Sequence, residues 1–312
     1  MQSASLPNST TSTASATMFY YWKDFRCTYE IHQPKNAQAV GIPILLIHPI
    51  GVGLSRLFWR RFCTEWYNTN HGNIIYSPDL LGCGESDNPR KAYTPIDWAE
   101  QLQHFLQTVV KTPVIVISQG GLLPVTIELV KLEPNLIKGL VLSGPTSWAV
   151  ITKNANKSRQ RILWNIFDSP IGNAFFRYAR TRNFLQSFSI KRLFAESKNV
   201  DDEWLNTLIG DAKNMTGRYA VFAFLAKFWQ RDYSSDLAGI QKPTFVVFGN
   251  KSSAISKEGK NETADDNLIK YLHCLPQAQG TKIKGRNVLP YESTVDFVEA
   301  ISPFIRGLET GS

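Results

Sequence analysis

One serine directly follows a stretch of apolar residues and precedes two glycines. Residues 114–117 are β-branched and predict a strand buried on both faces, whereas residues 122–130 predict a helix. Ser118, Gln119 and the two glycines fill the turn between them. A serine on a strand-to-helix turn is lifted above the sheet near a helix N-terminus, where its hydroxyl can act as a nucleophile. Ser118 is therefore the candidate nucleophile, and an ordinary Ser-Gly turn is the alternative.

Other stretches read as the elements that would position this serine. Residues 44–47 form a buried-strand run that ends in the loop His48-Pro49-Ile50-Gly51-Val52-Gly53. The strand-like residues 74–77 lead into Pro78-Asp79-Leu80-Leu81-Gly82-Cys83-Gly84-Glu85-Ser86. Amphipathic helices are predicted at residues 56–67 and 94–110, and further strands at residues 139–144 and 243–249.

These stretches resemble motifs of the α/β-hydrolase superfamily, and the resemblance extends from about residue 40 to about residue 305. It implies an α/β protein with a mostly parallel, doubly wound, eight-stranded-type sheet and an inserted helical cap. The turn departs from the usual Gly-x-Ser-x-Gly pattern, because Val116 occupies the first position. The expected parts are a disordered leader at residues 1–17, a core made of residues 18–145 and 236–312, and a helical cap at residues 146–235.

The resemblance also implies an oxyanion hole built from two backbone N–H groups. One belongs to Ile50, and the other belongs to Gln119, directly after the candidate nucleophile. Pro49 replaces the family's glycine and has no N–H of its own, but Ile50 keeps its donor.

The partners that a serine nucleophile needs are missing from their usual places. The family's acid position, after the penultimate strand, corresponds to Ser252. The family's histidine position, after the last strand, corresponds to Asn287, and an amide accepts no proton near neutral pH. A replacement base at His48, or a replacement acid at Asp265 or Asp266, remains open.

The segment predicted as the cap has its own composition. Between residues 151 and 200 it contains ten basic residues, two acidic residues and many aromatic rings. Trp164 and Phe167, together with His48, are the predicted lining of an apolar pocket over Ser118. Arginine beside aromatic rings suits an anionic membrane surface, although a solvated basic face fits the pattern equally well. No nucleic-acid-binding motif accompanies the basic residues, so we expect no nucleic-acid partner.

Composition limits the remaining possibilities. The chain has 312 residues, 43 % of them hydrophobic, and a formal net charge of +8, which allows one full core plus an insertion. No apolar run reaches the roughly 18 residues of a spanning helix, and the four cysteines lack metal-ligand spacing. Because phosphate-binding loops and signal peptides are also missing, we expect no metal, no cofactor and a cytoplasmic location, either free or peripheral at a membrane.

Two functions from different classes fit the sequence. The first is a carboxylic-ester hydrolase or acyl transferase that acts on an apolar or amphiphilic substrate through Ser118 with an altered relay. The second is a catalytically impaired protein of the same fold that binds an apolar ligand or a protein partner. The turn favours the first, and the absent histidine and acid favour the second. The loops around His48 and Asn287 are similar to those of a cyanobacterial or plastid subgroup, which fits a pigment- or lipid-like ligand.

Overall fold

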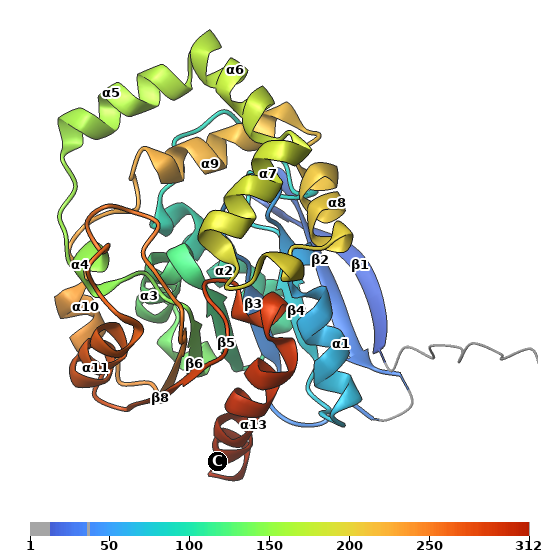
Figure 1. The fold of residues 1–312 in the computed structure, drawn as a ribbon. Coiled ribbons are helices and arrows are strands. Elements are labelled where there is room, and N and C mark those ends of the chain that lie inside the picture. Colours follow the sequence, from blue (N-terminus) through green and yellow to red (C-terminus); the bar gives the residue numbers. More distant parts are fainter. Residues whose placement is uncertain (1–12, 36–37, 312) are drawn as a thin grey trace, which may run out of the picture.

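The computed structural model describes residues 13–35 and 38–311. Its strands are β1 (Thr13–Trp22), β2 (Phe25–Pro34), β3 (Ile44–Ile47), β4 (Ile75–Pro78), β5 (Val114–Gln119), β6 (Ile137–Ser143), β7 (Thr244–Gly249) and β8 (Ala278–Ile283). They form one sheet in the order β1-β2-β4-β3-β5-β6-β7-β8. Only the β1–β2 and β2–β4 pairs are antiparallel. The expected α/β class with a mostly parallel sheet is confirmed (Figure 1).

Helices cover both faces of the sheet, as a doubly wound fold requires. Side chains of α1 (Arg60–Asn68) and α13 (Thr294–Thr310) pack on one face, with the short α12 (Leu289–Glu292) beside them. The opposite face is covered by α2 (Pro95–Phe105), α3 (Leu123–Leu132), α10 (Ser234–Ala238) and α11 (Ala264–Cys274).

The central strand β5 shows how these two layers meet. Val116 belongs to the apolar cluster that contains α2, α3 and α11 side chains, whereas Ile117 belongs to the cluster that contains α1 and α13. Successive side chains of a strand point to opposite faces. Ser118 therefore points toward the α3 layer and Gln119 toward the α13 layer. All residues of β5 are buried, which is why an apolar run alone identifies this strand.

The N-terminal end differs from the prediction. The expected leader covers residues 1–17, of which residues 1–12 lie outside the described part of the chain. Residues 13–17 form the first half of β1, in register with residues 30–34 of β2. The hairpin turn Lys23-Asp24 has positive φ at both positions, as a two-residue turn between twisted strands requires. The leader prediction was too long because backbone pairing with β2, which composition does not reveal, orders these small polar residues.

Residues 146–235 lie between β6 and β7, and we call them the helical insertion. Their helices are α4 (Trp148–Ile151), α5 (Lys157–Phe167), α6 (Pro170–Ala179), α7 (Arg182–Phe188), α8 (Asp202–Asp211) and α9 (Arg218–Leu225). In Figure 1, α5 and α6 lie at the end of the molecule opposite the C-terminus. Within the described ranges, no helix is both long enough and apolar enough to cross a bilayer.

Candidate active site

The turn after β5 lies two residues later than the sequence predicts. β5 continues through Gln119, and a single 3-10 turn at residues 120–122 leads into α3. Gly120 has φ +67°, a conformation that glycine adopts without strain. In a nucleophile turn the reactive residue itself occupies this sharp position. The position belongs to Gly120, so the predicted placement of the turn at Ser118 is wrong.

Ser118 lies inside the strand. It is in register with Ile47 of β3 and Leu142 of β6, and both neighbours belong to the α3-side cluster. Its side chain points into the same apolar layer, and the residue is only 3 % exposed. These neighbours provide no base that would take a proton from the hydroxyl.

Gly120 has no side chain at the point where a nucleophile would project. A Cβ built on Gly120 meets no non-neighbouring atom within 4 Å, so the turn faces open space. A Cβ built on Gly121 would lie 2.5 Å from the ring of Phe224 in α9. The helical insertion therefore packs against one side of the turn and leaves the other side open.

The backbone of Asn287 lies beside this turn. The Gln119 side chain donates to the Asn287 carbonyl at 2.7 Å. The Asn287 side chain uses both of its N–H groups, on the carbonyls of Arg192 at 2.7 Å and Ser253 at 2.9 Å. Its Oδ1 accepts from the Ser253 N–H at 3.3 Å. The amide thus joins three backbone segments, and it has no capacity to act as a base.

Asn287 belongs to a larger group of contacts that fasten the helical insertion to the core. Arg286 Nη1 donates to the Lys191 carbonyl at 2.7 Å. Glu292 accepts from the Ala195 N–H at 2.5 Å and from the Arg286 N–H at 2.9 Å. We call Arg286, Asn287 and Glu292 the clamp. It is built from the loop in which the family's catalytic histidine is expected.

The predicted acid position is also part of this structural network. The Ser252 N–H donates to the Gly249 carbonyl at 2.9 Å in the turn after β7. The next residue, Ser253, accepts from Arg286 Nε at 3.1 Å and from Arg286 Nη2 at 2.8 Å. A serine hydroxyl at this point cannot hold an imidazolium as a carboxylate does.

The two candidate replacement acids are engaged elsewhere. Asp266 forms a reciprocal capping box with Thr263 at the start of α11. Asp265 forms an ion pair with Lys282 on β8. Both carboxylates therefore have structural partners at the β8 side of the sheet.

His48 is fully buried and is held between two loops. Its Nδ1 donates to the Pro49 carbonyl at 2.8 Å, and its Nε2 accepts from the Leu80 N–H at 3.1 Å. Burial lowers the pKa of His48 to about 4. Because both ring nitrogens are used and the ring is neutral near pH 7, His48 is a structural residue and not a base.

The turn at Gly120 also changes the predicted oxyanion hole. Gln119 is part of β5 and is in register with Ser143 of β6. In the family, the donor follows the reactive position, which moves it from Gln119 to the N–H of Gly121. Ile50 is half-buried in the loop after β3 and stays the predicted first donor.

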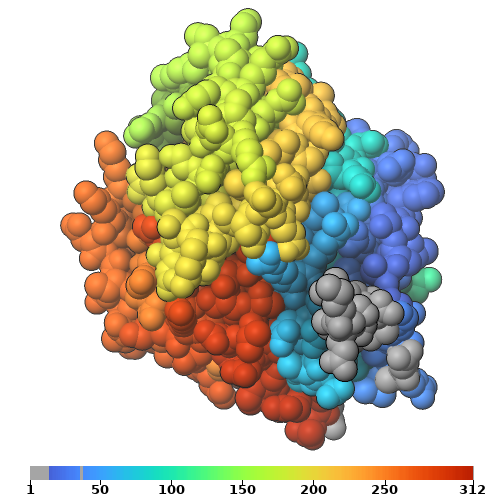
Figure 2. All heavy atoms as spheres, turned by 45° about the vertical axis from the view of Figure 1, so that its right-hand side comes forward, coloured from blue at the N-terminus to red at the C-terminus, as the bar shows by residue number. Residues whose placement is uncertain are grey.

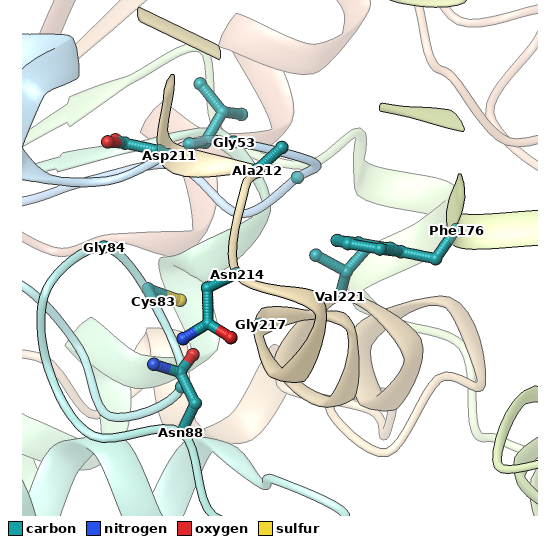
Figure 3. Close-up of a pocket in the computed structure, with 13 residues that line it drawn as sticks. Gly53, Cys83, Gly84, Asn88, Phe176, Asp211, Ala212, Asn214, Gly217 and Val221 are labelled. Atoms are coloured by element: carbon teal, nitrogen blue, oxygen red, sulfur yellow. The ribbon is translucent and has the colours of Figure 1, made fainter. Parts of the chain in front are cut away.

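Trp164 and Phe167, two of the predicted pocket residues, pack within the helical insertion. The Trp164 ring lies 5.7 Å from that of Phe228, and Phe167 stacks on Phe222 at 4.7 Å. A cavity opens elsewhere, between this insertion and the loops after β3 and β4 (Figure 3). Its lining includes Gly53, Gly84, Asn88, Phe176, Asp211 and Val221. The predicted pocket residues Trp164, Phe167 and His48 do not line it.

Asp211 borders this cavity and is a titratable group that the sequence analysis missed. Ser55 donates a hydrogen bond to its carboxylate. Burial raises the pKa of Asp211 to about 6, and the nearby Asp79 carboxylate adds to the effect. Asp211 is the last residue of α8, and its contacts come from residues far away in the sequence, so no local sequence signal indicated this group.

A second missed feature is a buried ion cluster around Arg56. The Arg56 side chain forms an ion pair with the fully buried Asp79 and pairs with Glu85 at 3.0 Å and Glu30 at 3.3 Å. Arg56 is 3 % exposed, so these carboxylates compensate a charge that water does not reach. The cluster fixes the loop after β4 to the residues that precede α1.

A buried parallel sheet, a sharp strand-to-helix turn and helices inserted between β6 and β7 define the α/β-hydrolase class of fold. The chain belongs to the alpha/beta hydrolase family, whose model matches residues 44–296. No curated protein matches the chain significantly.

Solved structures agree with this assignment. The chain is similar to a thermophilic esterase from Thermogutta terrifontis, with a TM-score of 0.71, 17 % identity and coverage of 95 % of this chain and 99 % of that chain. It is similar to the serine hydrolase CarC of carbazole degradation, with a TM-score of 0.72, 18 % identity and coverage of 94 % and 99 %. It is also similar to a membrane phospholipase A, a bacterial virulence factor, with a TM-score of 0.69, 15 % identity and coverage of 94 % of this chain and 86 % of that chain. At these identities the likeness establishes the fold.

Proposed function

We propose that this chain is a non-hydrolytic member of its family, which holds an apolar or amphiphilic molecule above the turn instead of cleaving an ester. Gly120 carries the proposal, because it occupies the sharp turn with φ +67° and has no side chain. A covalent acyl intermediate needs a nucleophilic atom at that point. Ser118, two residues earlier, points into the α3 layer.

The other two relay positions support the same proposal. Ser252 has a hydroxyl where a carboxylate is needed. The side-chain amide of Asn287 donates both of its N–H groups to the carbonyls of Arg192 and Ser253. Loss of a single relay member removes orders of magnitude in rate. With Gly120, Ser252 and Asn287 in the three positions, none of the three supplies the nucleophile, acid or base of an ester hydrolase.

The surroundings of Gly120 support a binding role. The space in front of its backbone is open, and the ring of Phe224 beside Gly121 gives one apolar wall. The adjacent Gln119 adds a polar atom, because its buried Oε1 has no hydrogen-bond partner among the described residues. Small-molecule sites are commonly apolar with a few placed polar groups. This combination suits a ligand that is mostly apolar with one hydrogen-bonding end.

Labelling with a fluorophosphonate probe tests the absence of an activated serine. We expect no labelling of the wild-type chain and no difference between it and Ser118→Ala. Hydrolysis of a p-nitrophenyl ester is measured in parallel and is expected to equal the background rate in both proteins. Labelling of the wild type that disappears in Ser118→Ala overturns the proposal and restores the hydrolase function.

Rebuilding the relay tests the position of the turn. The variant Gly120→Ser/Ser252→Asp/Asn287→His is compared with Gly120→Ala/Ser252→Asp/Asn287→His, which differs only by the hydroxyl. We expect ester hydrolysis at least about 100-fold faster with serine at position 120. Equal rates in two folded variants would contradict the assignment of Gly120 as the reactive position.

Filling the open space tests the ligand site. Gly120→Phe is compared with Gly120→Ala, because both substitutions place a side chain at φ +67° and only phenylalanine fills the open space in front of the turn. Binding of the amphiphilic dye 8-anilinonaphthalene-1-sulfonate is measured by fluorescence. Loss of binding in Gly120→Phe alone supports a site above the turn, whereas equal binding in both variants removes the ligand part of the proposal.

A further inference from the structure

The outer end of the helical insertion has apolar side chains that the described chain does not cover. α5 contains no buried residue at all. We call residues 157–179, which comprise α5 and α6, the insertion tip. Figures 1 and 2 show it as the projecting end of the molecule. Its large apolar side chains that are between 38 % and 70 % exposed are Ile162, Ile166, Ile171, Phe175 and Tyr178.

These side chains form continuous stripes. Ile162 and Ile166 are four residues apart and share one face of α5, and Ile171, Phe175 and Tyr178 share one face of α6. The inward faces of the same helices pack separately, through residues such as Trp164 and the buried Phe176. Phe175 also contacts Phe167 and Phe222, and Tyr178 contacts Phe184. The apolar surface that is additional to the inner packing is therefore mainly that of Ile162, Ile166 and Ile171.

The two helices are held at a fixed angle by a close backbone approach. A Cβ built on Gly172 of α6 would lie 1.8 Å from the Phe167 carbonyl oxygen at the end of α5. No side chain fits in that space, so glycine allows α6 to begin directly against α5. The stripes of both helices are thereby presented by one preformed unit.

Cations surround the apolar stripes. Lys157, Arg159, Arg161 and Arg177 are exposed, and in the described part of the chain none of them has an ion pair with a carboxylate. Arg159 lies three and seven residues before the two exposed isoleucines of α5, on the same helix face.

The acid of the insertion tip does not balance this charge. Asp168 accepts from Arg90 Nε at 3.0 Å and from Arg90 Nη2 at 2.8 Å. Arg90 lies in the loop before α2, so its charge neutralises Asp168 from outside the tip. The four exposed cations of the tip are thus left without local compensation.

We propose that the insertion tip docks on an anionic lipid bilayer. The apolar stripes would enter the interfacial region, and the four cations would contact lipid phosphates and other anionic headgroups. Charge complementarity selects this occupant. A second copy of the chain would bring the same uncompensated cations, on a molecule with a net charge of +8, against an identical surface.

Vesicle flotation with the full chain tests the proposal. The vesicles contain phosphatidylcholine alone or phosphatidylcholine with 30 % phosphatidylglycerol, at low and high salt. The wild type is expected to float with anionic vesicles at low salt, to be largely released at high salt and to ignore neutral vesicles. Arg159→Gln/Arg161→Gln is expected to bind roughly 25-fold more weakly, because each cation near the surface contributes roughly fivefold.

Two further variants distinguish binding through the tip from attraction by the overall positive charge of the protein. Lys111→Gln/Lys138→Gln removes the same charge at exposed positions outside the insertion and is expected to bind as the wild type does. Ile162→Asn/Ile171→Asn replaces the two most exposed isoleucines of the tip and keeps the charge. It is expected to lose flotation, while its circular dichroism stays native. Equal weakening by the two charge variants overturns the proposal, and so does flotation that is unaffected by the apolar substitutions. Absence of flotation together with concentration-dependent dimers that the apolar substitutions abolish would assign the tip to self-association instead.

Discussion

The two ends of the helical insertion are built on opposite principles. At the clamp, every side-chain hydrogen-bonding group of Asn287 has a backbone partner, and Arg286 and Glu292 fasten the adjoining segment. At the insertion tip, apolar stripes are uncovered and four cations have no described ion pair. The hydrogen-bonding groups of Asn287 in the clamp all have partners, whereas the apolar and cationic side chains of the tip have surfaces that a binding partner could cover.

This difference leads to different expectations for substitutions in the two regions. The loops that would hold a catalytic base and acid have become part of the structure, so substitutions there are expected to change stability. The exposed cations of the tip have no ion pair with a carboxylate among the described residues, so substitutions of these side chains are expected to change docking and not folding. Most of the following predictions compare a residue that has close contacts inside the fold with a matched residue that lacks them.

Arg56→Met is expected to have the largest effect. It would leave the fully buried Asp79 without its ion-pair partner, which lowers the free energy of unfolding by about 3–5 kcal/mol. Arg159→Met at the tip is expected to change it by less than about 0.5 kcal/mol. Urea denaturation of both variants checks the comparison. Similar losses in the two variants would show that the tip cations are part of the fold.

Gly53→Ala is expected to disturb the contact between the loop after β3 and α8. The new Cβ would lie 2.0 Å from the Leu208 carbonyl oxygen, at a position with φ +74°, so the loss is expected to be about 3 kcal/mol. Gly210→Ala, two residues further along α8, meets no atom within 4 Å and is expected to add up to about 1 kcal/mol through helix propensity. Thermal and urea unfolding measure both effects, and a stabilising Gly53→Ala would refute the close approach.

Asn287→Ala removes the side-chain bonds that connect the clamp with Arg192 and Ser253. The expected loss is about 2 kcal/mol, together with faster amide hydrogen exchange in the segment that joins α7 to α8. Asn165→Ala is the control, because this exposed residue on α5 has no described side-chain hydrogen bond, and its effect is expected to be near zero. Unchanged exchange in Asn287→Ala would mean that the clamp is not what holds the segment.

Asp211→Asn is expected to have the smallest effect and a defined pH dependence. The folded pKa of about 6 exceeds the ordinary value of 3.8, so the folded protein binds a proton more tightly than the unfolded chain. Stability of the wild type therefore falls as the pH rises from about 4 through 6. The variant lacks this loss and is expected to be more stable by about 1–2 kcal/mol at pH 8, with no advantage below pH 4.

The sequence predicted the sheet better than the site. Strands such as β3 and β5 are buried on both faces and therefore read as apolar β-branched runs. The turn was misplaced because Ser118 is a serine followed two residues later by Gly120, as the motif requires, with a misfit only at Val116. Moving the motif by two residues places Ser118 at the first small position, but it puts Gly120 at the serine position and Leu122 at the last glycine position, so the sequence favours the wrong alignment. The φ angle of Gly120 decides between the two alignments, and this angle is known only from the structure.

Other features depend on contacts between distant residues. Ser55 and Asp211 are 156 positions apart, so neither local periodicity nor composition brings them together. The ordering of residues 13–17 depends in the same way on their register with β2. By contrast, the excess of positive charge in the insertion was visible directly from the ten basic and two acidic residues between 151 and 200, although Lys153 and Arg182 pair with acids outside that range.

The glycine between α5 and α6 has a consequence for how the tip would meet a lipid surface. Many amphipathic helices acquire their shape only when they bind, and they lose chain entropy as they do so. Gly172 lets the Phe167–Gly172 junction form in the free protein, so this entropy is already lost during folding. Attachment and release of such a rigid wedge would require no helix–coil transition, and its footprint on the lipid would be the same before and after contact.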